Sequence, residues 1–294
     1  MLTPAVVVGT DGTEPATAAV RWAALEAGRR RLPLRIVYVL DWDWSVSRYD
    51  YQGDHFDVSR RLAGMVAEEA LRRAGDIAPG VDAGFQVPVG HPVTHLLHLS
   101  ETAELLVLGS RGRGGFAGLM LGSVSQRLAM HAKCPVVVVR GRADAATGPV
   151  AVGAEAGETA DAVLEAGFAA AADRGAGLVA VRSYVPAVAP PIGRIPPSEI
   201  RTPEQDAAER GRLAVQLAPW RAKYPDVRVE TLVSPDSAAS VLVEVSHGTQ
   251  LLVIGSHGHG LIAGAVLGST GMQLLHHADC PVLVVRRGPN GRTS

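Results

Sequence analysis

The residues best suited to chemistry lie in one glycine-rich stretch, residues 105–124, which reads LLVLGSRGRGGFAGLMLGSV. An apolar run ends at Gly109, and glycine recurs at positions 112, 114, 115 and 118. Gly122 and Ser123 then open a segment with helical spacing. A strand, a glycine loop and a helix N-terminus together offer backbone N–H donors and a positive dipole end. This stretch therefore predicts a cradle for a phosphate chain.

The same stretch occurs a second time, because residues 251–270 read LLVIGSHGHGLIAGAVLGST. Aligned at an offset of 146 and extended to Val139 and Val285, the two segments share 20 of 35 residues. The chain is therefore a duplication with one glycine loop in each half. The loops differ in charge, since Arg111 and Arg113 are replaced by histidines at 257 and 259. We expect the second site to be weaker or more dependent on pH.

Spacing separates this loop from the commoner phosphate loops. A P-loop requires a lysine in G-x-x-x-x-G-K-[ST], and neither Lys133 nor Lys223 lies in that context. A Rossmann fingerprint follows the first strand, and the turn there, residues 9–12, reads GTDG without the G-x-G-x-x-G pattern. Both classes are excluded, and the glycine loop here follows the fourth predicted strand of each half.

The composition indicates a globular protein with no electrostatic signature of nucleic acid or membrane binding. The 294 residues are 47% hydrophobic and 19% charged, with a formal net charge of −1. No apolar run approaches 18 residues, and residues 1–8 lack the features of a signal peptide. We therefore expect a cytoplasmic protein that binds neither nucleic acid nor membrane. The two cysteines, Cys134 and Cys280, occupy equivalent positions before apolar runs and are interpreted as buried thiols.

Apolar runs alternate with segments of helical periodicity through the first half of the chain. Strands are predicted at residues 5–9, 34–40, 83–89, 105–109 and 135–140, and helices at 14–30, 58–74, 92–100 and 123–131. Continuous apolar strands between helices indicate parallel pairing, with helices on both faces of each sheet. The predicted fold is α/β, doubly wound and Rossmann-like, with five parallel strands. In such sheets ligands lie beyond the carboxyl ends of the strands, where the strand order reverses.

The pattern restarts after a small, polar linker at residues 141–149. Strands are predicted at residues 150–153, 178–181, 230–233, 251–255 and 281–286, so that the domains span 1–141 and 149–288. Residues 41–57, rich in aromatics, and residues 184–203, rich in proline, differ between the halves. Each is interpreted either as a lid over the ligand or as a loop that packs on the other half.

The spacing G-x2-G-x9-G-S stands at Gly109, Gly112 and Gly122, and again at Gly255, Gly258 and Gly268. The chain resembles a tandem universal stress protein of the ATP-binding type, whose signature is G-x2-G-x9-G-[ST]. The resemblance covers nearly the whole chain. It implies one ATP per domain, with Mg²⁺ or Mn²⁺ as a companion ion. It also implies that the fifth strands, residues 135–140 and 281–286, pair in an intrachain pseudo-dimer that can form a homodimer.

By this resemblance Asp11 would meet the ribose or the ion, and the backbone of Val39 would face adenine. In the second half Ala154 and Glu155 replace Thr10 and Asp11, and Val181 is taken as the counterpart of Val39. The residues expected to contact nucleotide in the first half are Gly9, Thr10, Asp11, Val39, Gly109, Ser110, Arg111, Gly112, Arg113, Gly114, Gly122, Ser123 and Val124. Those in the second half are Gly153, Glu155, Val181, Gly255, Ser256, His257, Gly258, His259, Gly260, Gly268, Ser269 and Thr270.

Other constellations predict little chemistry. His91, His95 and His98 share a helix face but are interpreted as solvated, and His131 with Cys134 ends a helix. We therefore assign no metal site. No nucleophile elbow or paired carboxylates are recognisable, so we expect no enzyme beyond slow ATP hydrolysis. The alternatives to an ATP-binding regulatory stress protein are an adenine-nucleotide transfer enzyme or hydrolase, and a nucleotide-free interaction module.

Overall fold

The computed structural model describes residues 4–42, 54–112, 121–155, 157, 159–184, 203–256 and 267–286. The chain divides into two compact units, Met1–Asp144 and Ala145–Ser294. The predicted linker at residues 141–149 spans this division. Residues 43–53 and 185–202, which make up most of the predicted lid segments, lie outside the described residues.

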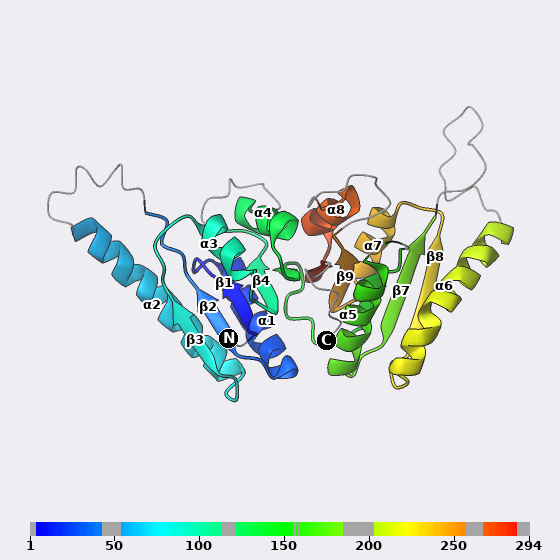
Figure 1. Cartoon of the computed structure of the whole chain (residues 1–294), viewed down its shortest axis with the longest axis horizontal. Coiled ribbons are helices and arrows are strands. Elements are labelled where there is room, and N and C mark those ends of the chain that lie inside the picture. Colours follow the sequence, from blue (N-terminus) through cyan, green and yellow to red (C-terminus); the bar gives the residue numbers. More distant parts are fainter. Residues whose placement is uncertain are drawn as a thin grey trace, which may run out of the picture. The chain divides into compact units, whose positions relative to one another are not determined.

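Unit 1 alternates strands and helices from end to end. In chain order its elements are β1 (Val6–Gly9), α1 (Glu14–Arg30), β2 (Leu34–Val37), α2 (Asp54–Ile77), β3 (Ala83–Gln86), α3 (Pro92–Leu99), β4 (Leu105–Gly109), α4 (Ser123–His131) and β5 (Val136–Val139). All its strand pairs are parallel, in the order β3-β2-β1-β4-β5, and Figure 1 shows α2 lying alongside β3.

Unit 2 repeats this architecture. Its elements are β6 (Val150–Gly153), α5 (Ala160–Asp173), β7 (Leu178–Ser183), α6 (Pro203–Lys223), β8 (Val229–Ser234), α7 (Ala238–Ser246), β9 (Leu251–Gly255), α8 (Ser269–His277) and β10 (Val282–Val285). Its strands are also parallel, in the order β8-β7-β6-β9-β10 (Figure 1). The predicted doubly wound α/β class is confirmed for both units.

Helices cover both faces of each sheet, as two glycines in unit 1 show. Gly9 and Leu108 lie side by side on one face, where a Cβ atom on Gly9 would lie 3.2 Å from Leu96 of α3. Gly109 faces the other way, and its Cβ would lie 2.6 Å from the backbone of Pro15 in α1. Because α3 packs on α4 and α1 packs on α2, the two helix pairs enclose the sheet.

The central strands form the core. Every residue of β1, β4 and β5 is buried, as the continuous apolar runs predict for a sheet covered on both faces. The strand order reverses between β1 and β4 in unit 1, and between β6 and β9 in unit 2. The turn at Asp11 and the loop after Gly109 both leave the sheet at this point of reversal.

Candidate functional site

The turn after β1 holds the Asp11 carboxylate in a fixed orientation. Thr10 N donates to the Val37 carbonyl at 2.9 Å, which continues the sheet one residue beyond β1. Asp11 Oδ1 then accepts from Thr13 N at 3.1 Å and from Thr13 Oγ1 at 2.6 Å. Gly12 follows with φ of +81°, a left-handed conformation that favours glycine. The turn thus orients one carboxylate oxygen by two hydrogen bonds.

The structure brings Asp11 and the glycine loop together. A Cβ atom on Gly112 would lie 2.5 Å from Asp11 Oδ2, so close that the Asp11 side chain would have to move. Glycine at 112 therefore lets the loop backbone pass directly beside the carboxylate. The sequence placed both features at the same edge of the sheet, and the structure shows that they touch.

The two ends of the loop are closed by a hydrogen bond, which we call the neck. Gly122 N donates to the Ser110 carbonyl at 2.7 Å, and a Cβ on Gly122 would lie only 3.5 Å from the Cα atom of Arg111. Inside the fold, Ser125 Oγ of α4 donates to the Gly109 carbonyl at 2.7 Å. Beginning and end of the loop are therefore fixed, while residues 113–120, with Arg113 and Gly114, lie outside the described residues.

The N-terminus of α4 faces the neck and has no side-chain cap from the described residues. Gly122 occupies the N-cap position with φ −75° and ψ 147°. Ser123 is exposed and Val124 is half-buried. Because Gly122 closes the neck, the first backbone N–H groups of the helix follow the neck directly. Arg111, at the start of the loop, is also exposed. N–H donors, the positive helix end and a guanidinium are suited to bind an anion at this point.

Unit 2 repeats the neck. Gly268 N donates to the Ser256 carbonyl at 3.3 Å, and Gly268 is the N-cap of α8 with φ −61° and ψ 164°. Ser269 is exposed and Thr270 half-buried, as at the equivalent positions of unit 1. Gly255 ends β9 as Gly109 ends β4. Residues 257–260, with both predicted histidines, lie outside the described residues.

The turn after β6 differs from its counterpart in unit 1. Ala154 N donates to the Val181 carbonyl at 2.7 Å, but Ala154 has no hydroxyl to match Thr10 Oγ1, which accepts from Gly12 N at 3.3 Å. The Glu155 carbonyl instead accepts from Gln216 Nε2 of α6 at 3.3 Å. The second turn is therefore tied to the neighbouring helix by a hydrogen bond.

The strand register corrects one predicted correspondence. Val181 pairs with Gly153 as Val37 pairs with Gly9, so Val181 matches Val37 and the counterpart of Val39 is Ser183. The predicted counterpart lies two residues too early because the apolar run of the strand, and with it the predicted strand, ends at Val181. In the structure β7 continues through the polar Arg182 to Ser183. Arg182 is accommodated by an ion pair with Glu209 of α6 at 2.9 Å.

Two supporting residues were missing from the sequence prediction. Thr13 orients Asp11, and the short D-x-T spacing was a usable signal because aspartate side chains often accept from the backbone two residues on. Ser125 anchors the end of β4, and no local pattern marks it. Its counterpart in unit 2 is Gly271, where a Cβ atom would lie 2.6 Å from Leu267 Cδ1.

The histidines considered for zinc lie on α3 and at the residue before it. His91 is the N-cap of α3, and His98 Nδ1 lies 3.5 Å from Glu101 Oε2. Across the described part of the chain, no three His, Cys, Asp or Glu side chains are grouped as metal ligands. No described helix is long and apolar enough to cross a membrane.

Comparison with known proteins agrees with the duplicated loop. The model of the universal stress protein family matches residues 4–140 and 147–286. The chain belongs to the universal stress protein family. A universal stress protein of Mycobacterium tuberculosis is 34% identical over 294 residues, covering 96% of this chain and 97% of the relative. One from Mycolicibacterium smegmatis is 32% identical over 290 residues, with 96% of each chain covered.

A solved structure extends the likeness to the fold of the tandem protein. The crystal structure of a universal stress protein from Archaeoglobus fulgidus superimposes with a TM-score of 0.74 at 19% identity. The match covers 98% of this chain and 100% of the other. At that identity the likeness concerns the fold, and the ligand of this universal stress protein has to be argued from its own residues.

Proposed function

We propose that this universal stress protein binds ATP at one site in each unit and acts as a nucleotide-dependent regulatory protein of the stress response. The observation that carries the proposal is the loop neck, which sets the N-terminus of α4 beside the Asp11 turn. The same neck occurs in unit 2 at α8. The same neck hydrogen bond in both halves, at the point where strand order reverses, supports a ligand-binding role over a purely structural one.

The chemistry of the neck favours a polyphosphate. The N–H groups of Ser123 and Val124 and the guanidinium of Arg111 can each donate to phosphate oxygens. Such hydrogen bonds to charged groups are worth about 1.5–3 kcal/mol each. Gly112 keeps the loop free of side-chain bulk beside Asp11. The negatively charged phosphates of ATP match these three groups of donors better than an uncharged ligand would.

Asp11 adds a requirement to this site. Its carboxylate lies against the loop and would repel phosphate oxygens at close range. A bound Mg²⁺ or Mn²⁺ would supply positive charge between the two groups, and carboxylate oxygen is a ligand that both ions accept. We therefore propose that Asp11 of unit 1 holds the companion ion, and that Glu155 does so less favourably in unit 2, because its turn is built differently.

We prefer a regulatory role to an enzymatic one because one oxygen of the Asp11 carboxylate is already engaged in hydrogen bonds within its own turn. Its Oδ1 already accepts two hydrogen bonds from Thr13, so that oxygen serves to orient the turn. Efficient ATP hydrolysis needs a group that positions the attacking water. We propose slow hydrolysis at most, in a cytoplasmic protein whose two units form the intrachain pseudo-dimer predicted by the family resemblance.

The direct test is to denature the purified full-length protein and to identify released nucleotide by chromatography and mass spectrometry. We expect adenine nucleotide, or ATP binding by the emptied protein in calorimetry. Gly122→Glu should remove one ATP per chain, because the carboxylate would enter the neck of unit 1 by bulk and charge. Gly268→Glu should do the same for unit 2.

A matched control is Gly64→Glu, because a Cβ atom on Gly64 in α2 would meet nothing within 4 Å. This variant adds the same charge away from the neck and should keep both sites. Absence of nucleotide, together with no binding of added ATP, would refute the proposal and favour the interaction module. Turnover of ATP that disappears in Asp11→Ala would favour the transfer enzyme or hydrolase.

A further inference from the structure

The strand next to each glycine loop is followed directly by an arginine that the family signature does not include. In unit 1, Gly109 of β4 pairs with Val139 of β5. The pairing continues for one more step, because Ser110 N donates to the Val139 carbonyl at 3.0 Å. Arg140 is therefore the partner of Ser110, whose carbonyl closes the neck. Neighbouring parallel strands lie about 4.8 Å apart, so Arg140 is one strand spacing from the loop.

The alternation of side chains places Arg140 on the same face of the sheet as α4. Leu108 lies on the face covered by α3, where it meets Gly9, and its partner Val138 shares that face. Two residues on, Arg140 projects to the same side. Because α4 packs on α3 and begins at the neck, Arg140 lies at the N-terminal end of α4. Arg140 is half-buried, and its Nε atom is buried.

Unit 2 has an arginine in the same position by the same geometry. Ser256 N donates to the Val285 carbonyl at 3.0 Å, which makes Arg286 the partner of Ser256. Ile254 meets Gly153 on the face of α7, and its partner Val284 shares that face. Arg286 therefore lies at the start of α8, and it is also half-buried with a buried Nε atom.

We propose that Arg140 and Arg286 are phosphate-binding residues. Each donates hydrogen bonds from its guanidinium N–H groups to the polyphosphate held at the neck of its own unit. This inference rests on the proposed function. A positive helix end and a guanidinium on the same face both attract an anion. The planar guanidinium can form two parallel hydrogen bonds to a phosphate group, whereas a lysine offers a point charge. In unit 2, where the loop carries histidines instead of arginines, Arg286 supplies a charge that does not depend on pH.

The experiment measures binding of ATP, ADP, AMP and adenosine to the full chain by calorimetry, in the presence of Mg²⁺. A Gly268→Glu background reports unit 1 alone, and a Gly122→Glu background reports unit 2. Arg140→Gln should weaken ATP binding to unit 1 by about 10- to 100-fold, the value of one or two charge-assisted hydrogen bonds. The loss should shrink from ATP to AMP and vanish for adenosine. Arg140→Lys should recover part of the affinity. Arg286→Gln should act in the same way on unit 2.

The control is Arg31→Gln, which makes the same charge change at an exposed residue after α1, at the opposite edge of the sheet. It should leave every affinity unchanged. Far-UV circular dichroism and thermal unfolding establish whether each variant folds. If Arg140→Gln does not fold, Arg140→Lys still tests the inference. ATP binding by Arg140→Gln as tight as that of its background would overturn this inference alone. No ATP binding by the unmodified chain would overturn this inference together with the proposed function. An equal loss for ATP and adenosine would show a structural role and would also overturn it.

Discussion

Gly109→Ala should both destabilise unit 1 and open its loop neck. The added Cβ atom would lie 2.6 Å from the carbonyl carbon and oxygen of Pro15 and 2.9 Å from Ala16 N. Carbon atoms in contact are normally about 3.5–4.0 Å apart, so β4 and the first turn of α1 must separate by roughly 1 Å. Both are backbone segments that cannot rotate away. Overpacking of this kind costs about 1–3 kcal/mol of folding free energy.

The same displacement reaches the next residue. The Ser110 carbonyl accepts from Gly122 N at 2.7 Å, and a shift of roughly 1 Å would stretch this contact beyond hydrogen-bonding range. Loss of that bond should cost about 1 kcal/mol more and leave the start of α4 displaced from the loop. We therefore expect lower ATP affinity in unit 1 together with the lower stability.

Urea unfolding followed by far-UV circular dichroism measures the stability change, and calorimetry in the Gly268→Glu background measures ATP binding to unit 1. The control is Gly64→Ala, where nothing lies within 4 Å of the added Cβ. That substitution in the interior of α2 should stabilise the protein by up to about 1 kcal/mol. An unfolding midpoint for Gly109→Ala equal to that of the wild type would refute the steric reasoning.

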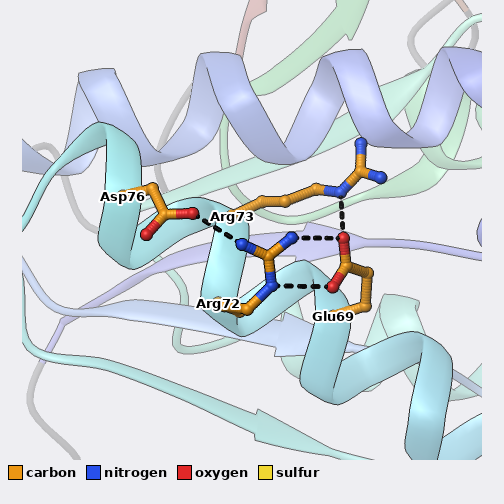
Figure 2. Close-up of polar contacts among 4 residues, drawn as sticks. All are labelled: Glu69, Arg72, Arg73 and Asp76. Atoms are coloured by element: carbon orange, nitrogen blue, oxygen red, sulfur yellow. Dashed lines mark hydrogen bonds and ion pairs between the residues drawn. The ribbon is translucent and has the colours of Figure 1, made fainter.

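Two further predictions concern ATP binding at Gly112 and the pH dependence of stability at Glu69. Gly112→Ala should weaken ATP binding with little loss of stability, because the added Cβ displaces only the Asp11 side chain. Calorimetry measures the ATP affinity and urea unfolding measures the stability. An unchanged ATP affinity would contradict this prediction. The second prediction concerns Glu69 on α2, which accepts hydrogen bonds from Arg72 and Arg73 (Figure 2). These two guanidinium groups lower the pKa of the Glu69 carboxyl from 4.5 to about 2. Because the folded pKa is depressed, the stability that Glu69 contributes is present above pH 4.5 and is lost as the pH falls towards 2. The difference in unfolding free energy between wild type and Glu69→Gln should disappear over that range and shrink in high salt. An NMR titration of Glu69 at its ordinary pKa would contradict this.

Element boundaries were predictable where turn chemistry marks them. The helices α1 and α4 and the strand β4 have the bounds that the sequence predicts, since Gly109 ends an apolar run and Gly122 precedes a helix. β3 was predicted to reach residue 89 but ends at Gln86, because Pro88 has no N–H to donate to the sheet. Beyond it only an isolated bridge joins Leu40 and Val89.

Polar residues account for two other misplaced boundaries. α2 begins at Asp54, four residues before the predicted start, because three of the four residues in its first turn are polar and apolar periodicity does not register them. β7 extends past the predicted Val181, because Arg182 is paired within the fold by Glu209. A partner 27 positions away along the chain cannot be read from local pattern.

The candidate site was predictable in its outline and not in its contacts. Glycine spacing placed the loop, the helix start and the Asp11 turn at one edge of the sheet, and the structure brings these together. The bond from Gly122 to Ser110 and the anchoring of Gly109 by Ser125 depend on three-dimensional packing. The nucleotide contacts assigned to each residue stay predictions.

Under the proposed function, the hydrogen bond from Gln216 to the Glu155 carbonyl distinguishes the ligand response of one unit from that of the other. After a gene doubles within one reading frame, each copy can be tuned while the other preserves the original task. Here the neck hydrogen bond is present in both units, whereas the turn after the first strand differs between them. Two binding sites of unequal affinity in one polypeptide fill in succession as the ligand concentration rises. Their combined occupancy therefore changes over a wider range of ligand concentration than that of two identical sites. If both units bind ATP as proposed, the chain would respond to graded changes in ATP concentration rather than only to its presence.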